Sequence, residues 1–361
     1  MTISRIIFWQ PFASPHQEAF LEAVAEQFPG EVILAVEQDM PPERVAQGWR
    51  KPVHKLVRVI DVSSPSNHAA LTTHRGADSL HVFTGFFSHP LVWAAFRALK
   101  SSQARLAIYS EAPEQAWHTG WLKRLRGRWL AGRYARRFAF VLAVGGVGCE
   151  FFETIGFPRR KIIPFGYYLD VPPLSEIEAD GPHDDIFRFI SAGQLIHRKG
   201  IDLLIKACDR LPTNGWQLAI YGDGPERRSL EQLVARLGPS DRITFCGPAA
   251  NPVVQQAVAA ADCAVLPSRF DGWGAFVNES LSHGTPVICS SRCGAAAAVE
   301  AVEAGAVFPA ADIDKLGDAM RAAVSGSRPT REHREQIHAR TKAAISAHTA
   351  AGRFCEVMSH A

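Results

Sequence analysis

The stretch that decides the fold spans residues 270–286 and reads Phe270-Asp271-Gly272-Trp273-Gly274-Ala275-Phe276-Val277-Asn278-Glu279-Ser280-Leu281-Ser282-His283-Gly284-Thr285-Pro286. One apolar run, Cys263 to Pro267, precedes it and another, Pro286 to Cys289, follows it; both are typical of buried strands. Between them, a Gly-Trp-Gly turn leads into a short segment that ends at Gly284, a residue type expected just beyond a helix C-terminus. The stretch therefore predicts a strand, a glycine loop, a short helix and a second strand.

The glycine loop predicts a site for an anion that also carries hydroxyl groups. Free backbone N–H groups at a helix N-terminus, together with the helix dipole, favour negative charge. Asp271 in the loop and Glu279 on the polar side of the helix place two carboxylates beside that anion. A nucleotide-sugar has both a diphosphate and hydroxyls. The alternative is a glycine turn that caps an ordinary helix, with Glu279 in solvent.

At these residues the sequence resembles the retaining glycosyltransferases of family 4. These have the GT-B fold, an α/β architecture of two Rossmann-like, doubly wound domains that face each other across a cleft. The family carries two acidic residues eight positions apart, here Asp271, where Glu is usual, and Glu279. The resemblance implies that Glu279 holds the donor ribose, Asp271 the donor sugar and the loop amides the diphosphate. The loop residues implied are Asp271, Gly272, Trp273, Gly274, Ala275 and Phe276.

A second segment, Phe187 to Asp202, is similar to the family's donor-phosphate segment. Lys199 is in place before a glycine, but Gln194 follows Gly193 where the family has an arginine. Losing this bidentate cation is expected to weaken phosphate binding or change the donor, although Arg198 is placed to help. By the same resemblance, Cys246 and Gly247 are expected near the nucleotide base. The candidate catalytic residues are Lys199, Asp271 and Glu279, together with Glu111 in the N-terminal half.

The N-terminal half reads as the start of another doubly wound sheet, whose ligands lie at the carboxyl ends of the strands. His16 and Gln17 follow the first expected strand in a polar loop, so they are acceptor-side candidates; a solvated loop is the alternative. Glu111 ends the expected strand from Leu106. It is expected to orient an acceptor hydroxyl or act as its base, or else to cap a helix.

The segment 121–137 carries seven cations and no acid. Its large apolar residues recur at helical spacing: Trp121, Leu122, Leu125, Trp129 and Leu130. A basic amphipathic helix with tryptophans fits an anionic membrane surface. The alternative is a core-facing helix with a solvated basic face. Nucleic acid is not expected as a partner, because the net charge is only +3 and no other feature supports it.

Length and composition fit a soluble protein of two domains, with 361 residues, 47% hydrophobic and 21% charged. The odd number of scattered cysteines, seven, favours reduced thiols and a cytoplasmic protein, peripheral on the inner face of the membrane at most. We expect an acceptor-binding domain at 1–170, a linker at 171–184 and a donor-binding domain at 185–340. A C-terminal helix at about 341–361, with Thr341 to Met358 as its candidate, is expected to cross back to the first domain.

These features predict an enzyme that moves a sugar, with retention, from a nucleotide-sugar to a glycan acceptor. By family analogy, the acceptor is lipid-linked and the pathway builds cell-surface polysaccharide or glycoconjugate. No metal or other cofactor is expected, since no Asp-x-Asp motif is placed to hold a divalent ion. Two alternatives stay open: a nucleotide-sugar epimerase of the same fold, and a non-catalytic partner that binds nucleotide or membrane. The non-catalytic alternative is supported by Gln194, which replaces the usual arginine, and by Asp271, which replaces the usual glutamate.

Overall fold

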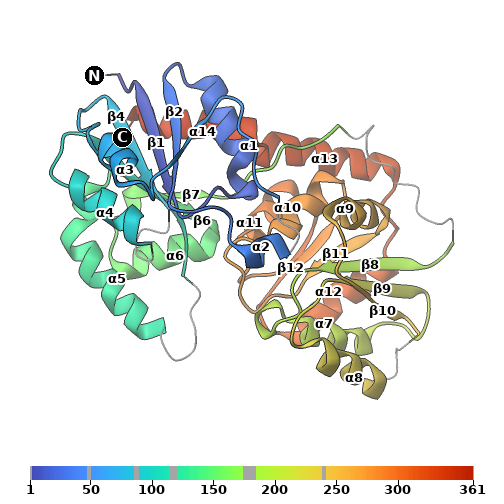
Figure 1. Cartoon of the computed structure of the whole chain (residues 1–361). Coiled ribbons are helices and arrows are strands. Elements are labelled where there is room, and N and C mark those ends of the chain that lie inside the picture. Colours follow the sequence, from blue (N-terminus) through green and yellow to red (C-terminus); the bar gives the residue numbers. More distant parts are fainter. Residues whose placement is uncertain are drawn as a thin grey trace. The chain divides into compact units, whose positions relative to one another are not determined.

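The chain forms two compact units, each with its own parallel sheet (Figure 1). The computed structural model describes residues 2–46, 50–84, 89–113, 120–173, 184–237 and 241–360. Unit 1 consists of Met1–Asp170 and Ala347–Ala361, and unit 2 of Val171–Ser346.

The sheet of unit 1 has seven parallel strands in the order β3-β2-β1-β4-β5-β6-β7. Central strand β1 pairs with β2 and β4, so that Phe8 lies between Leu34 and Val82. Its central strands are mostly apolar on both faces because helices cover both, as is usual for parallel sheets, whereas edge strand β3 is largely exposed. The strands are β1 (Arg5–Gln10), β2 (Glu31–Val36), β3 (Arg58–Asp61), β4 (Ser79–Phe83), β5 (Arg105–Glu111), β6 (Phe140–Val144) and β7 (Ile162–Phe165).

Figure 1 shows α1 and α14 on one face of this sheet and α3, α4, α5 and α6 on the other. Aromatic contacts fix the layers: Phe354 of α14 lies 5.7 Å from Phe8, and Phe96 of α4 lies 5.9 Å from Phe83, between ring centroids. The helices are α1 (Pro15–Gln27), α2 (Pro42–Ala46), α3 (Pro65–Thr72), α4 (Pro90–Leu99), α5 (Gly120–Tyr134), α6 (Gly145–Ile155) and α14 (Ala347–His360), with 3-10 turns η1 (Ala135–Arg137) and η2 (Arg159–Lys161).

Unit 2 repeats the plan with six strands in the order β10-β9-β8-β11-β12-β13. Its core includes Leu204, Leu218, Val265 and Leu316, which pack between the sheet and helices α7 and α12. The strands are β8 (Phe187–Ala192), β9 (Trp216–Tyr221), β10 (Ile243–Gly247), β11 (Cys263–Leu266), β12 (Val287–Ser290) and β13 (Gly305–Phe308). The helices are α7 (Ile201–Ala207), α8 (Arg227–Leu237), α9 (Asn251–Ala260), α10 (Ala275–Ser282), α11 (Ala296–Val302), α12 (Ile313–Ser325) and α13 (Arg331–Ile345), with 3-10 turns η4 (His197–Lys199) and η5 (Cys208–Arg210).

Each sheet has one place where the strand order reverses direction, between β1 and β4 in unit 1 and between β8 and β11 in unit 2. Loops leaving adjacent strands diverge there, which leaves a crevice at the carboxyl ends where ligands of doubly wound sheets bind. These two switch points are where functional residues are to be sought.

Some expected elements differ from the structure. The single helix expected from Thr341 to Met358 is two helices, because Ser346 is extended and the Ala347 amide donates to Leu169 O (3.1 Å). His16 and Gln17 lie in the first turn of α1 rather than in a loop, because Pro15 begins the helix. The strand expected to reach Phe86 ends at Phe83, and residues 85–86 lie outside the described residues, as do 174–183 of the expected linker.

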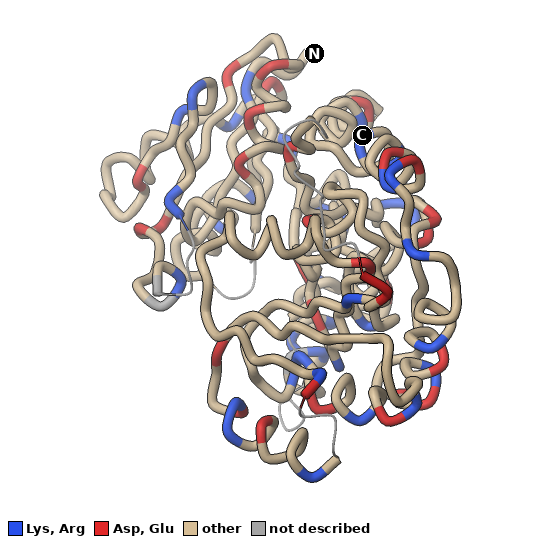
Figure 2. The backbone as a smooth tube through the Cα atoms, turned by 90° about the vertical axis from the view of Figure 1, so that its right-hand side faces the viewer, with Lys and Arg blue, Asp and Glu red and all other residues tan. Residues whose placement is uncertain are grey.

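Charged residues of both signs are interspersed along most of the backbone (Figure 2). This distribution agrees with the small net charge of +3. In the described parts of the chain, no helix has the length and apolar character to pass through a bilayer.

Candidate active site

The switch point of unit 2 brings Lys199 and Asp271 together. Lys199 ends the turn after β8, and Asp271 lies in the loop after β11, so both side chains leave the same edge of the sheet. Lys199 Nζ lies 2.5 Å from Asp271 Oδ2, and the two side chains are only 17% and 11% exposed. Two residues 72 positions apart, each implicated by the sequence, thus form a mostly buried ion pair.

Two further side chains approach the Asp271 carboxylate. Arg198 Nη1 lies 3.6 Å from Oδ1 and donates a hydrogen bond to Phe270 O at 3.0 Å. The buried Ser268 hydroxyl lies 3.5 Å from Oδ2. Arg198, expected from the sequence to help bind phosphate, therefore lies beside the Asp271 carboxylate, whereas no sequence motif marked Ser268.

A second ion pair locks the two loops to each other. Arg269, after β11, binds Asp202 of α7 through two bonds of 2.6 and 2.8 Å, and its backbone N–H donates to Arg198 O. Gly200 allows the loops to meet: its φ is +70°, and an added Cβ would lie 2.3 Å from Pro267 O. These contacts hold the segments that carry Lys199 and Asp271 against each other. No short-range sequence pattern predicted them.

The glycine loop is fixed on its other side by the segment after β12. The Asp271 N–H donates to Arg292 O (3.0 Å), and the Gly294 N–H donates to Asp271 O (3.1 Å). Gly274 precedes α10 with φ +90°, and an added Cβ there would lie 2.5 Å from Cys293 Sγ. Only glycine fits, so Ala275 and Phe276 begin α10 directly beside Asp271, with the N-terminus of the helix at the loop.

Glu279 of α10 is half-buried close to the same cation. Burial raises the pKa of its carboxyl group, while a hydrogen bond from Gln255 of α9 and the positive charge of Lys199 lower it. The carboxylate is thus within electrostatic reach of Lys199. The structure brings Lys199, Asp271, Glu279, the loop of residues 272–274 and the first residues of α10 to one edge of unit 2.

The remaining donor-side candidates lie along this edge. Gly193 is adjacent to the Lys199 side chain, since an added Cβ would lie 3.9 Å from Nζ, and Gln194 follows it at the end of β8. Cys246 and Gly247 end β10, separated from β8 by β9. The Gly222 N–H donates to Gly247 O at 2.8 Å, and the Cys246 thiol is exposed beside the Tyr221 hydroxyl.

The acceptor-side candidates His16, Gln17 and Glu111 line one pocket of about 250 Å³ within unit 1. The pocket lies at the carboxyl edge of the sheet, by the switch point between β1 and β4. The other residues that line it include Gln10, Arg44 and Tyr167, which the sequence did not single out. They come from β1, α2 and the segment after β7, and only the strand order shows that they meet.

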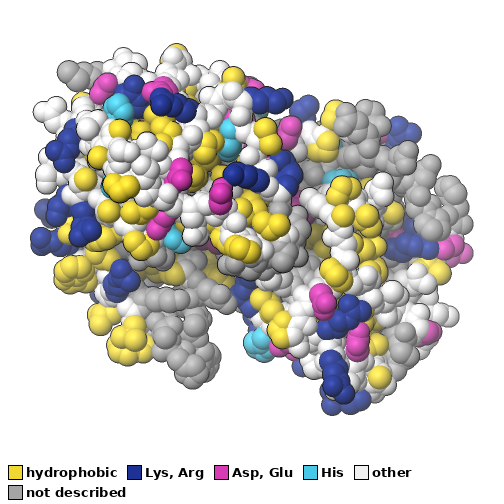
Figure 3. Space-filling model, in the orientation of Figure 1, with side chains coloured by type: hydrophobic (Ala, Val, Ile, Leu, Met, Phe, Trp, Pro, Cys, Tyr) yellow, Lys and Arg dark blue, Asp and Glu magenta, His cyan; other side chains and the backbone are white. Residues whose placement is uncertain are grey.

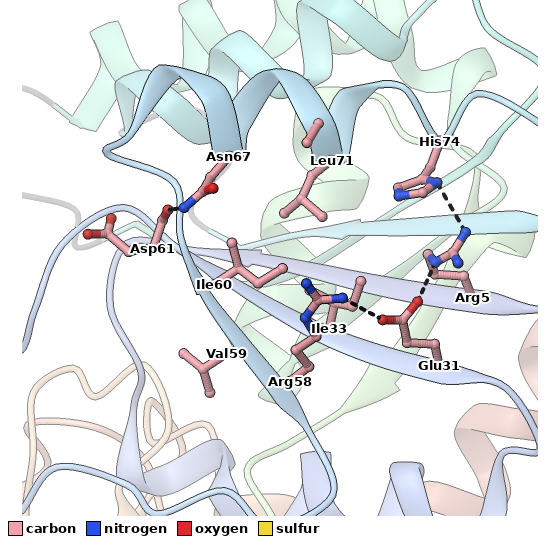
Figure 4. Close-up of a pocket in the computed structure, with 11 residues that line it drawn as sticks. Arg5, Glu31, Ile33, Arg58, Val59, Ile60, Asp61, Asn67, Leu71 and His74 are labelled. Carbon is pink, nitrogen blue, oxygen red and sulfur yellow. Dashed lines mark hydrogen bonds and ion pairs between the residues drawn. The ribbon is translucent and has the colours of Figure 1, made fainter.

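A roomier pocket of about 460 Å³ lies elsewhere in unit 1, between α3 and the strands β1, β2 and β3, of which β3 is the edge strand (Figure 4). Four of its side chains bind one another: Glu31 pairs with Arg5 (2.7 Å) and Arg58 (3.2 Å), and Arg5 forms a hydrogen bond with His74 (3.0 Å). Burial lowers the pKa of His74, helped by the charge of Arg5. None of the candidate residues from the sequence lines this pocket.

Helix α5 presents apolar side chains to solvent. Trp121, Leu125 and Trp129 are 60%, 59% and 65% exposed, and Leu122 is 48% exposed. Leu130 alone of the five large apolar residues is buried. In Figure 3, hydrophobic and basic side chains lie side by side on the part of unit 1 where Figure 1 labels α5. A helix that turns this stripe to the core is therefore excluded.

Comparison with known proteins agrees with this geometry. Residues 175–343 match the family model "Glycosyl transferases group 1". The chain is 27% identical over 293 residues to the lipopolysaccharide core biosynthesis mannosyltransferase LpsB of Rhizobium meliloti, covering 74% of this chain and 79% of that protein. It is 38% identical to LpsE, a lipopolysaccharide core biosynthesis glycosyltransferase of the same organism, over 27% of this chain and 28% of LpsE. Residues 175–343 thus form a group 1 glycosyltransferase domain.

The fold comparison extends over the whole chain. The crystal structure of Anabaena HepE in complex with UDP has a TM-score of 0.72 at 17% identity, covering 100% of both chains. The expected GT-B fold of two Rossmann-like domains is therefore confirmed. By sequence, the chain spans only about a third of the length of most curated relatives that it matches, for example 29% and 36%.

Proposed function

We propose that this protein is a retaining glycosyltransferase of the family 4 type. It transfers a sugar from a nucleotide-sugar donor to a glycan acceptor in the assembly of a cell-surface polysaccharide or glycoconjugate. The observation that carries this proposal is the Lys199–Asp271 pair, 2.5 Å apart at the switch point of unit 2, beside the N-terminus of α10. A cation, a helix N-terminus and two carboxylates suit a ligand with a diphosphate and hydroxyls.

Each group has a distinct role in this proposal. The ammonium of Lys199 has three donors, so it can keep Asp271 and still bind the diphosphate. Asp271 accepts hydroxyls of the donor sugar, and Glu279 accepts those of the ribose. Cys246 and Gly247, at the end of β10, lie beside the base. Arg198, near Asp271 Oδ1, supplies part of the positive charge that Gln194 does not.

Bond cleavage develops negative charge on the departing nucleoside diphosphate. Lys199, whose side chain is mostly buried, and the first amides of α10 stabilise that charge. We assign no nucleophile and no metal to this chemistry. Activity is expected to survive EDTA, and loss of activity that added divalent cations restore would contradict a metal-independent mechanism.

The relatives support this proposal for the donor and the pathway. HepE has been crystallised with UDP and with UDP-glucose, and LpsE and LpsB are named for lipopolysaccharide core biosynthesis. We therefore propose a nucleoside-diphosphate sugar as donor and a lipid-linked glycan as acceptor.

The direct test is transfer to octyl glycosides of glucose, galactose and mannose from UDP-, GDP- and ADP-sugars. We expect the acceptor to gain the mass of one sugar as nucleoside diphosphate is released, with the anomeric configuration of the donor kept in the product by NMR. Lys199→Ala should abolish transfer, and Glu279→Gln should raise the donor KM. Release of free, altered sugar without a glycoside product would identify an epimerase instead.

We also propose that α5 holds the enzyme on the cytoplasmic face of an anionic membrane. Its exposed stripe of Trp121, Leu125 and Trp129 can enter the headgroup region, and the arginines beside it attract anionic lipid. The protein should co-sediment with phosphatidylglycerol vesicles at low salt and less at high salt. Trp121→Ser/Trp129→Ser should prevent this, whereas Leu56→Ser, which alters an exposed leucine elsewhere in unit 1, should not. Equal sedimentation of both variants would reject the role of α5.

A further inference from the structure

The acceptor-side pocket of unit 1 contains a chain of hydrogen-bonded side chains that ends on Glu111. The Gln10 amide donates to Gln17 Oε1, and both side chains are buried, at 1% and 3% exposure. Gln17 in turn bonds to the Tyr167 hydroxyl, and Tyr167 bonds to Glu111. Four polar groups from β1, α1, β5 and the segment after β7 are thus linked in series.

The direction of each hydrogen bond in this chain is fixed. Because Gln17 accepts from Gln10 through its oxygen, its amide nitrogen is the group left to donate to the Tyr167 oxygen. Burial, followed by the negative charge of Glu111, raises the pKa of Tyr167 well above its usual value. The phenol therefore stays protonated, and its O–H group donates a hydrogen bond to the Glu111 carboxylate.

The Tyr167 ring is itself held on two sides. It stacks on His16 with centroids 6.2 Å apart at 21°, and it meets Tyr109 at 6.1 Å. The Tyr109 hydroxyl donates to Gly166 O at 2.6 Å and so fixes the backbone directly before Tyr167. Glu111 is thereby oriented, and the bond from Tyr167 uses one of the roughly four lone-pair positions of a carboxylate.

We infer that Tyr167 is a positioning residue for the acceptor: it orients the Glu111 carboxylate so that it accepts a hydroxyl of an acceptor sugar in the pocket of unit 1. This inference rests on the proposed glycosyl transfer. It adds Tyr167 and Gln10, which lie outside the sequence motifs, and links them to the acceptor-side candidates Gln17 and Glu111. The ligand class is a saccharide unit that donates a hydroxyl to Glu111.

The test is Tyr167→Phe, which keeps the ring between His16 and Tyr109 and removes only the hydroxyl. We expect the acceptor KM for the best octyl glycoside to rise about tenfold, since a hydrogen bond to a charged group is lost. The donor KM should stay the same. The acidic limb of the pH–rate profile should move to higher pH, because a bond that favours the ionised carboxylate is gone. Tyr168→Phe, which alters the neighbouring buried tyrosine, should leave the acceptor KM, the donor KM and the acidic limb of the pH–rate profile unchanged.

A second variant and a binding assay make the result decisive. Gln17→Met breaks the chain one step upstream and should shift the acceptor KM in the same direction but less. Saturation-transfer NMR with the same octyl glycosides measures binding without turnover and should show weaker binding to Tyr167→Phe. Absence of transfer by the wild type, with glycoside binding that still depends on Tyr167, would refute the proposed activity alone. Equal acceptor KM and equal binding in the wild type and Tyr167→Phe would overturn this inference.

Discussion

Lys199 Nζ lies 2.5 Å from Asp271 Oδ2, joining the loops that leave strands β8 and β11. The pair lies where the strand order of unit 2 reverses. The ion pair between Arg269 and Asp202 joins the same two segments of the chain. A cation held in place before any ligand arrives needs little reorganisation to bind a diphosphate. The same contact has consequences for stability that can be measured without a substrate.

Lys199→Met should lower the free energy of unfolding by about 3 kcal/mol, because it leaves a mostly buried carboxylate without its ammonium partner. Lys206→Met is the matched control: Lys206 lies 3.3 Å from Asp202 but is 43% exposed, so its loss should remain below about 1 kcal/mol. Urea unfolding measures both. The double variant Lys199→Met/Asp271→Leu should recover most of the loss. If Lys199→Met and Lys206→Met lower the free energy of unfolding equally, the buried pair contributes no more to stability than an exposed pair.

Gln194→Arg should tighten nucleotide binding about tenfold, because a guanidinium fork binds phosphate through two parallel bonds. Gln194 follows Gly193, whose added Cβ would lie 3.9 Å from Lys199 Nζ, so the new cation would share the site. Gln194→Met is a neutral control of similar size and should not tighten binding. Dissociation constants from calorimetry would settle the comparison, and an unchanged constant for Gln194→Arg would place the phosphates elsewhere.

Cys246 should be protected from alkylation by the bound nucleotide. It is exposed at the end of β10, whereas Cys149 and Cys355 are half-buried, and burial raises the pKa of both thiols. Iodoacetamide should therefore react first with Cys246, and nucleotide at ten times its Kd should slow this about tenfold. Peptide mass spectrometry follows each thiol separately. If Cys246 reacts with iodoacetamide at the full rate when nucleotide is saturating, Cys246 does not lie beside the bound base.

The buried His81 should cause the free energy of unfolding of unit 1 to decrease as the pH is lowered into the mildly acidic range. Its ring is buried, Trp9 Nε1 donates to its Nδ1 at 3.1 Å, and burial lowers its pKa to about 4. The unfolded histidine titrates near 6.5 and so binds a proton first. The stabilisation is therefore complete above pH 6.5 and declines toward pH 4, by about 3 kcal/mol in total.

Urea unfolding between pH 4.5 and 7.5 measures this decline. His81→Phe should be less stable at neutral pH yet lose less on acidification than the wild type. His360→Gln, at an exposed histidine, should follow the wild-type curve. Parallel curves for the wild type and His81→Phe would assign the acid sensitivity to other groups.

The fold of unit 2 could be predicted because its deciding residues lie at strand ends. The run before Asp271 and the glycine at 274 together specify a strand, a turn and a helix, and each is a local feature. The confirmed fold follows from repeating that unit along the chain. By contrast, the Arg269–Asp202 brace joins residues 67 positions apart and depends on the order of β8 and β11.

The unpredicted features share this dependence on tertiary structure. Tyr167 meets Gln17 and Glu111 only because β1, β5 and β7 belong to one sheet. The break between α13 and α14 comes from a hydrogen bond of Ala347 to Leu169, which no helical periodicity reveals. Spacing alone also could not decide whether the apolar stripe of α5 faces the core or solvent.

Calorimetric titration with UDP, GDP, ADP and CMP tests the central claim most directly, that the Lys199–Asp271 edge of unit 2 binds the diphosphate of a nucleotide-sugar. We expect one nucleoside diphosphate to bind to the wild type and to Lys206→Ala with the same Kd. Lys199→Ala should bind it at least about tenfold more weakly. Absence of binding by all four nucleotides, or equal binding by Lys199→Ala, would contradict the claim.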